Sequence, residues 1–115
     1  PAYFLSLETK PDNYTLSVDA TATCNGAHYC NIGAVQGVKG GKVTMQKNMK
    51  NRVITQEIKL ANGTSAYFTP GHAMGDYWPA SVQVIANDTL YTLTWDLPAN
   101  VAKKFLVTMA ESLIK

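Results

Sequence analysis

Apolar and polar residues alternate along several short stretches of this chain, with the period of two that half-buried β-strands show. In one such stretch Tyr14, Leu16 and Val18 alternate with polar residues. Residues typical of turns separate the stretches, so each is expected to be a short strand. The strands predicted in this way are residues 2–7, 14–18, 32–38, a run that starts at 43, 52–60, 64–69, 81–86 and 89–95.

Two dipeptides in the second half of the chain favour tight hairpin turns. Asn62-Gly63 is the stronger signal, because both residues tolerate the positive φ that a type I′ turn requires. Asn87-Asp88 is expected to play the same part between the last two strands. Short strands joined mostly by tight turns predict a largely antiparallel sheet.

The end of the chain has a different period. Asn100 is a suitable N-cap, since its side chain can accept a hydrogen bond from an amide of the first helical turn. The residues that follow predict an amphipathic helix with one apolar stripe that faces the core. That stripe consists of Ala102, Phe105, Leu106, Met109, Leu113 and Ile114.

These elements predict an α+β fold. We expect a twisted antiparallel sheet of six to eight short strands, with the single C-terminal amphipathic helix packed on one face. A chain of 115 residues leaves room for one core, so residues 1–115 are expected to form a single domain.

Composition narrows the classes of partner. The chain is 46% apolar and 16% charged, which is typical of a folded globular protein. Its net charge of +2 is too small and too scattered to indicate nucleic acid or an anionic membrane as the partner. No stretch approaches the roughly 18 to 20 apolar residues that a membrane span needs, so no membrane insertion is expected.

Cys24 and Cys30 are the two cysteines of the chain, and they enclose a short turn-like segment. This spacing favours a disulfide-closed loop that fixes a local shape, while two reduced thiols are the alternative. A disulfide predicts an extracytoplasmic location, whether periplasmic, in the cell envelope or secreted.

The segments NGTSAYF, SVQVIANDTLYTLTW and FLVTMAESLIK follow a recognisable order. This order resembles the C-terminal half of an uncharacterised extracytoplasmic domain of Gram-positive lipoproteins and anti-sigma-type regulators, and more distantly the PsbP-like and Mog1-like folds. The resemblance implies a non-enzymatic envelope domain and transfers no catalytic residue. Residues 72–79 and the cysteine loop depart from the pattern. The matching positions are Gly63, Ala66, Tyr67, Tyr91, Leu93, Ala110, Glu111 and Ser112.

The sequence contains little that predicts catalysis. His28 and His72 are the only candidates for a general base at neutral pH, and no nucleophile motif accompanies either. A pair of Cys30 with His72 would need a free thiolate. A zinc site that combined both histidines with Cys24 and Cys30 would have suitable ligand types, but its spacing matches no standard zinc motif. We therefore predict no catalytic residue, no metal site and no cofactor.

The segment 70–79 is the longest interruption of the strand pattern, and long loops in compact domains are often functional. It contains His72, Met74, Tyr77 and Trp78, and aromatic residues are common anchors of binding surfaces. The alternative is that Tyr77 and Trp78 cap an open end of the core. His28 and Tyr29 in the cysteine loop are the second set of predicted binding residues.

The sequence favours a binding function over the other classes. The leading hypothesis is an extracytoplasmic module that recognises a protein or cell-envelope component, as a sensor or as an inhibitor or immunity-type protein. The alternative is a carrier of a small apolar, lipid-like ligand held between sheet and helix. An enzyme would need one of the histidines beside a nucleophile in a cleft.

Overall fold

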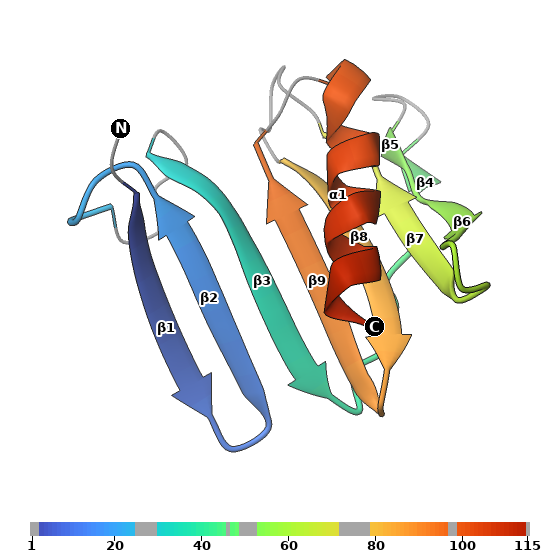
Figure 1. The fold of residues 1–115 in the computed structure, drawn as a ribbon, viewed down its shortest axis with the longest axis horizontal. Helices are drawn as coiled ribbons and strands as arrows, with labels where there is room; N and C mark the ends of the chain where they lie inside the picture. The colour runs from blue at the N-terminus through green and yellow to red at the C-terminus, as the bar shows by residue number, and fades with distance from the viewer. Residues whose placement is uncertain are drawn as a thin grey trace.

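The computed structural model describes residues 3–24, 30–45, 47–48, 53–71, 79–96 and 99–114. In these parts of the chain it has a seven-stranded antiparallel sheet, a two-stranded ribbon and one helix (Figure 1). The α+β fold predicted from the sequence is confirmed. The elements are β1 (Phe4–Lys10), β2 (Asn13–Asp19), β3 (Asn31–Lys39), β4 (Lys47–Asn48), β5 (Val53–Ile54), β6 (Gln56–Lys59), β7 (Ser65–Thr69), β8 (Ala80–Ala86), β9 (Thr89–Trp95) and α1 (Ala99–Leu113).

The large sheet has the order β1-β2-β3-β9-β8-β7-β6, and β4 pairs with β5 in the separate ribbon. The chain first makes an antiparallel β1-β2-β3 meander and then leaves the sheet after β3. It returns at the opposite edge with β6, and β7, β8 and β9 are added in order toward β3. The last strand, β9, then pairs with β3, with Val35 opposite Leu93. This pairing joins the first third of the chain to the last third in the middle of the sheet.

Helix α1 packs across β8 and β9 on one face of the sheet and leaves β1, β2 and β3 uncovered (Figure 1). Its contact with the sheet forms the core. No helix among the described residues is long and apolar enough to cross a membrane. The buried core residues are Leu60, Ala66, Phe68, Ala80, Val82, Val84, Leu93, Ala102, Leu106 and Ala110.

The helix differs from its prediction in two respects. It begins at Ala99, so Asn100 lies inside the helix rather than at the N-cap. The face that is fully buried is formed by Ala102, Leu106 and Ala110, which are exposed by no more than 1%. The predicted stripe was centred on larger side chains. Small residues allow the helix to approach the sheet closely, and this places Phe105 and Leu113 on its flank with 39% and 38% of their surface exposed.

Both predicted hairpins are present, but only one of them has the predicted type of turn. Asn87 and Asp88 both have positive φ, of 52° and 64°, and they join β8 to β9 in the two-residue turn that this geometry favours. In the turn between β6 and β7 Gly63 has a positive φ of 87° but Asn62 does not, so the type I′ prediction there is wrong. The connection is longer, since Lys59 and Ser65 form the last strand pair.

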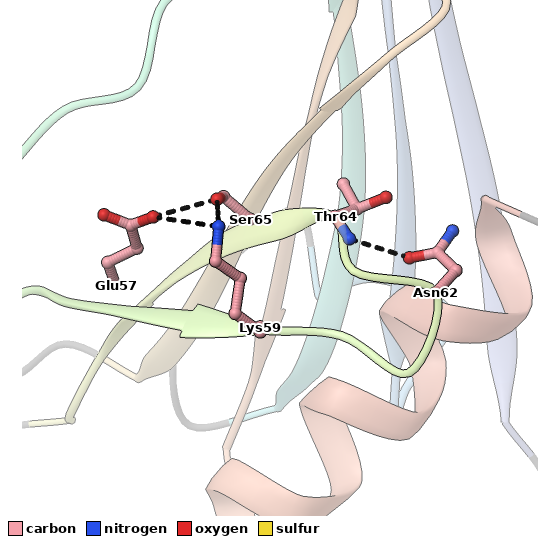
Figure 2. Close-up of polar contacts among 5 residues, drawn as sticks. All are labelled: Glu57, Lys59, Asn62, Thr64 and Ser65. Carbon is pink, nitrogen blue, oxygen red and sulfur yellow. Dashed lines mark hydrogen bonds and ion pairs between the residues drawn. The ribbon is translucent and has the colours of Figure 1, made fainter.

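Local hydrogen bonds stabilise this longer connection (Figure 2). The Asn62 side-chain oxygen accepts a bond from the Thr64 amide at 3.0 Å, as in an Asx turn. Beside it, the Ser65 hydroxyl donates to Glu57 at 2.8 Å and accepts from Lys59. The amide of Ala61 donates to the carboxylate of Glu111 on α1, so the turn is tied to the helix.

Two further strand predictions need correction. The predicted strand 52–60 is divided at Thr55 into β5 and β6, and the two parts belong to different sheets. The run expected from residue 43 is not a strand through residue 45, and β4 consists of two residues only. Residues 43–45 cross the open face of the sheet instead of extending it, as described below.

The predicted disulfide between Cys24 and Cys30 is confirmed, with a Cα–Cα distance of 5.7 Å. Both cysteines are buried at the end of the β2–β3 connection. Next to the disulfide, the backbone amide of Ala20 donates to the carbonyl oxygen of Cys30 at 2.7 Å, and the side-chain amide of Asn31 donates to the carboxylate of Asp19 at 2.8 Å. The disulfide therefore closes a connection whose base is already fixed by hydrogen bonds.

Two glycines of β3 lie under aromatic rings of the neighbouring strands. A Cβ atom at Gly33 would be 2.2 Å from the ring of Trp95 and 2.6 Å from the carbonyl oxygen of Thr94. A Cβ atom at Gly37 would be 2.3 Å from the ring of Tyr14. The Trp95 ring also contacts Phe105 of α1, with 5.2 Å between ring centroids. Gly33 therefore helps the helix to dock, because it leaves space for the indole that the helix packs on.

We predict that Gly33→Ala destabilises the protein by about 1–3 kcal/mol, the usual cost of overpacking, since both a ring and a backbone oxygen occupy the space of the new methyl group. The free energy of unfolding in urea measures this cost. In a Trp95→Leu background the same substitution should cost less. An unchanged cost in that background would show that the indole is not the cause.

Candidate functional site

All six residues predicted to bind a partner, His28, Tyr29, His72, Met74, Tyr77 and Trp78, lie outside the described residues. Their role stays a prediction. The described residues on each side of the 72–78 segment are informative, because Thr69 and Pro79 both line the largest pocket found among the described residues. This pocket is the candidate site.

The pocket has a volume of about 580 Å³ and lies on the open face of the sheet, opposite α1. Side chains alternate between the two faces of each strand, so the residues next to Val82 and Leu93 in the sequence point away from the core. Strands β3, β9 and β8 form the floor. The lining residues are Gln36, Thr44, Thr69, Pro79, Ser81, Gln83, Leu90, Thr92 and Thr94.

The polar residues of the floor form two rows that run across the strands. In one row Thr92 of β9 pairs with Gln36 on one side and with Gln83 on the other. In the other row Ser81 pairs with Thr94 and with Thr69. Neighbouring strands are about 4.8 Å apart, and alternate residues along a strand are about 6.7 Å apart. The floor is therefore a regular array of hydroxyl and amide groups.

One wall of the pocket is held by the side chain of Gln83, which is only 8% exposed. Its carbonyl oxygen accepts a hydrogen bond from the Thr44 amide at 2.9 Å, and its amide donates to the Thr44 carbonyl oxygen at 2.9 Å. The side chain thus binds the main chain of Thr44 as a neighbouring strand would. This pair of bonds holds the segment after β3 across the open face of the sheet.

A second polar pair lies at the Thr69 side. The hydroxyl groups of Thr55 and Thr69 are 2.8 Å apart, and both residues are 5% exposed. The pair connects the short segment between β5 and β6 to β7. The wall is thus fixed before any ligand arrives, which lowers the entropy cost of binding.

The chemistry of the pocket is neutral. Its nine lining residues carry hydroxyl, amide and apolar groups, and none of them is ionisable. Among these described residues an anion would find no cationic side chain, and a cation no carboxylate. An apolar ligand would displace water from the hydroxyl groups without replacing their hydrogen bonds, at a cost of about 1–3 kcal/mol for each group left unsatisfied. A neutral ligand with its own hydroxyl or amide groups fits the lining best.

A smaller groove of about 350 Å³ lies on the helix side of the sheet, between α1 and β3. It is mostly apolar, and it opens toward the uncovered strands. Tyr14 of β2 lies on the same side of the sheet but does not line the groove. Burial raises the pKa of its hydroxyl above the usual range, and the neighbouring Tyr91 adds to this effect. The groove residues are Val35, Leu93, Phe105, Thr108, Met109, Ser112 and Leu113.

The disulfide changes the chemistry that the sequence left open. A sulfur atom in the Cys24–Cys30 bond is not a thiolate, so neither the Cys30–His72 pair nor the zinc set containing both cysteines is available in this state. Within the described residues no three His, Cys, Asp or Glu side chains gather in an arrangement that could hold a metal ion.

The strand pattern contained a signal for this pocket that the sequence predictions did not use. Thr92 and Thr94 alternate with apolar residues in β9, and Gln83 interrupts the apolar run of β8. Their polarity identifies the face opposite the core. It does not show that another segment crosses this face and makes it concave, because that depends on the contact between Gln83 and Thr44, which lie far apart in the sequence.

No protein family, no curated protein and no solved structure was found to match this chain.

We predict that Gln83→Ala destabilises the protein by about 1–3 kcal/mol, because it removes two hydrogen bonds to the Thr44 main chain. Gln36→Ala is the matched control, since Gln36 lines the same pocket but is exposed. It should change the free energy of unfolding by less than about 0.5 kcal/mol. Urea denaturation of both variants tests this, and equal costs would contradict the role given to Gln83.

Proposed function

We propose that this protein is a non-enzymatic, extracytoplasmic binding module that recognises a neutral, hydroxyl-rich component of the cell envelope, such as a segment of a glycan. The observation that carries the proposal is the pocket on the open face of the sheet, whose described lining consists of Thr, Ser and Gln residues with Leu90 and Pro79 and contains no ionisable group. Hydroxyl and amide groups both donate and accept hydrogen bonds, as the hydroxyl groups of a sugar do.

The size and construction of the pocket support this proposal. A volume of about 580 Å³ lies within the range of roughly 300–1,000 Å³ that is usual for small-molecule sites. Two rows of polar groups about 6.7 Å apart allow more than one unit of a polymer to be bound at once. Leu90 and Pro79 add apolar surface against which the face of a sugar ring can pack.

The disulfide supports the extracytoplasmic part of the proposal. The Cys24–Cys30 bond is compatible with a protein that functions outside the reducing cytoplasm. Within this class we propose a sensor or an inhibitor of a process at the cell envelope. Its activity would depend on whether the ligand occupies the pocket. Thr69 and Pro79, the described residues on each side of the 72–78 segment, line the pocket.

The test is a titration of isotope-labelled protein with a neutral oligosaccharide of N-acetylglucosamine, followed by NMR, together with co-sedimentation with insoluble cell-wall glycan. We expect shifts at the amides of β8 and β9. The double variant Thr92→Val/Thr94→Val keeps the shape of both side chains and removes both hydroxyl groups. It should weaken binding by about tenfold or more, as the loss of two hydrogen bonds predicts.

Thr15→Val is the matched control, because Thr15 lies on the open face of β2 but outside the pocket. It should bind as the original protein does. The proposal fails if the oligosaccharide and the wall glycan both leave the pocket resonances unchanged, or if the control variant loses as much binding as the double variant.

A second candidate function is the transport of a small apolar ligand, and the apolar groove between α1 and β3 favours it. In that case a fluorescent fatty acid should bind the protein, and Met109→Asp should reduce binding by about tenfold or more by placing a charge in the groove. Thr44→Val in the opposite pocket should have no effect. Absence of fatty-acid binding, with no ligand seen in native mass spectrometry, would rule out this function.

A further inference from the structure

The sheet is much wider than the helix that covers it. Figure 1 shows that α1 does not lie over strands β1, β2 and β3. On the side of α1, the pairing register places apolar residues of these three strands on one surface, which we call the helix-side face. Leu5 and Leu7 of the edge strand are 68% and 64% exposed there. The apolar residues of the face are Leu5, Leu7, Tyr14, Leu16, Val18 and Val35.

The alternation of β1 shows that this surface is not required for the stability of one copy. Leu5 and Leu7 point to the helix side, while Ser6 and Glu8 point to the open side. None of the described elements covers the two leucines, which are 68% and 64% exposed, so they contribute little buried area to the single chain. An exposed apolar face that is continuous across several strands is typical of an interaction surface.

The helix extends this surface. The flank of α1 that borders the groove carries Phe105, Met109 and Ser112, and none of the groove residues is charged. The charged residues of α1 lie elsewhere. Lys103 lies 5.8 Å from the centre of the Phe68 ring on β7, and Glu111 binds the amide of Ala61 beyond β6. The described lining of the groove is therefore uncharged on both sides, apolar toward the sheet and mostly apolar toward the helix.

One row of residues connects the exposed edge to the groove. Leu7 pairs with Leu16, Leu16 pairs with Val35, and Val35 pairs with Leu93. Val35 and Leu93 line the groove, so the row runs from the edge strand into it. The surface thus contains both a projecting part, the leucines of β1, and a hollow part, the groove beside α1.

We propose that two copies of this chain associate through the helix-side face, each placing its edge strand β1 in the groove beside α1 of the other. The two-fold axis runs parallel to β2 between the two sheets. Such an axis places β1 of the second copy over β3 of the first. The row through Leu7 and Val35 in one copy then faces the same row in the other copy. The interface is isologous, as in most dimers.

The thickness of the layers fits this arrangement. Packed sheets are about 10 Å apart, and a helix has a diameter of about 10 Å. The β1–β3 half of the second sheet therefore lies in the same layer as α1 of the first copy, beside the flank that carries Phe105 and Met109. Lys104 and the open faces of both sheets stay in solvent.

The available area also fits a dimer. Three strands of about seven residues form a face of roughly 23 Å by 14 Å, and the flank of α1 brings this to roughly 500 Å² in projection. A corrugated surface has more accessible area than its projection. The projected area of each partner lies slightly below the roughly 600 Å² per partner that marks the lower limit of stable interfaces, in the range of weak and transient ones. The dimer is expected to be reversible and concentration-dependent.

Sedimentation velocity over a concentration series up to about 500 µM tests the proposal, since this range detects dissociation constants in the micromolar range. The original protein should convert from monomer to dimer. Leu5→Glu/Leu7→Glu should stay monomeric and keep its circular dichroism spectrum and urea midpoint, because both side chains are exposed in one copy. Phe4→Glu/Ser6→Glu adds the same charge to the opposite face of β1 and should still dimerise.

The arrangement itself is tested by mixing Leu7→Cys protein with Met109→Cys protein and adding a short thiol cross-linker. We expect cross-linked heterodimers. A monomer at every concentration overturns the proposal. Dimerisation of the Leu5→Glu/Leu7→Glu variant overturns it as well, because pairing of two β1 edges through their backbones would then be the contact. Cross-linking of Leu7→Cys only with itself would also exclude the proposed geometry.

Discussion

The one helix among the described residues is too narrow to cover a face of the seven-stranded sheet. Most features of this protein follow from this difference in width. Seven strands span about 34 Å, whereas a helix is about 10 Å wide. Helix α1 therefore makes a core over β8 and β9, built on Leu93, Leu106 and the small residues Ala102 and Ala110. Everything outside this contact must be stabilised by strand pairing, by crossing segments or by another molecule.

The pairing of β3 with β9 makes so wide a sheet possible. It attaches the N-terminal meander to the half of the sheet that the helix stabilises, with Gly33 giving room for Trp95 at the junction. The same junction shapes both surfaces. On the open side the pocket spans β3, β9 and β8, and on the helix side the groove lies above β3 and β9. A ligand at either surface would bridge segments that are distant in the sequence.

The alternation of residues was sufficient to predict most strands of the large sheet, because the side chains of a strand point alternately to its two faces. Strand β6 was predicted only as part of the longer strand 52–60, because the pattern does not show the break at Thr55. The hairpin at Asn87-Asp88 and the C-terminal helix could also be predicted, since local residues determine both. The orientation of the helix could not. Hydrophobicity favours Phe105 and Leu113, but the close approach to the sheet favours Ala102 and Ala110, and that depends on the partner surface. The pocket was missed for a similar reason, because the bonds between Gln83 and Thr44 connect segments that local pattern does not relate.

The two surfaces lie on opposite sides of one sheet and have opposite chemistry. The open side offers hydroxyl and amide groups, which bind a neutral polar ligand better than an apolar one, and the helix side offers Leu5, Leu7 and the apolar groove. Neither surface obstructs the other. Association through the helix side leaves both pockets facing outward, away from the two-fold axis. A polymer with repeated units could then occupy two pockets at once, and the second contact would form at the high effective concentration set by the first. A pocket with weak affinity for one unit would in this way retain a polymer in the cell envelope, which connects the neutral lining of the site to the exposed leucines of an edge strand.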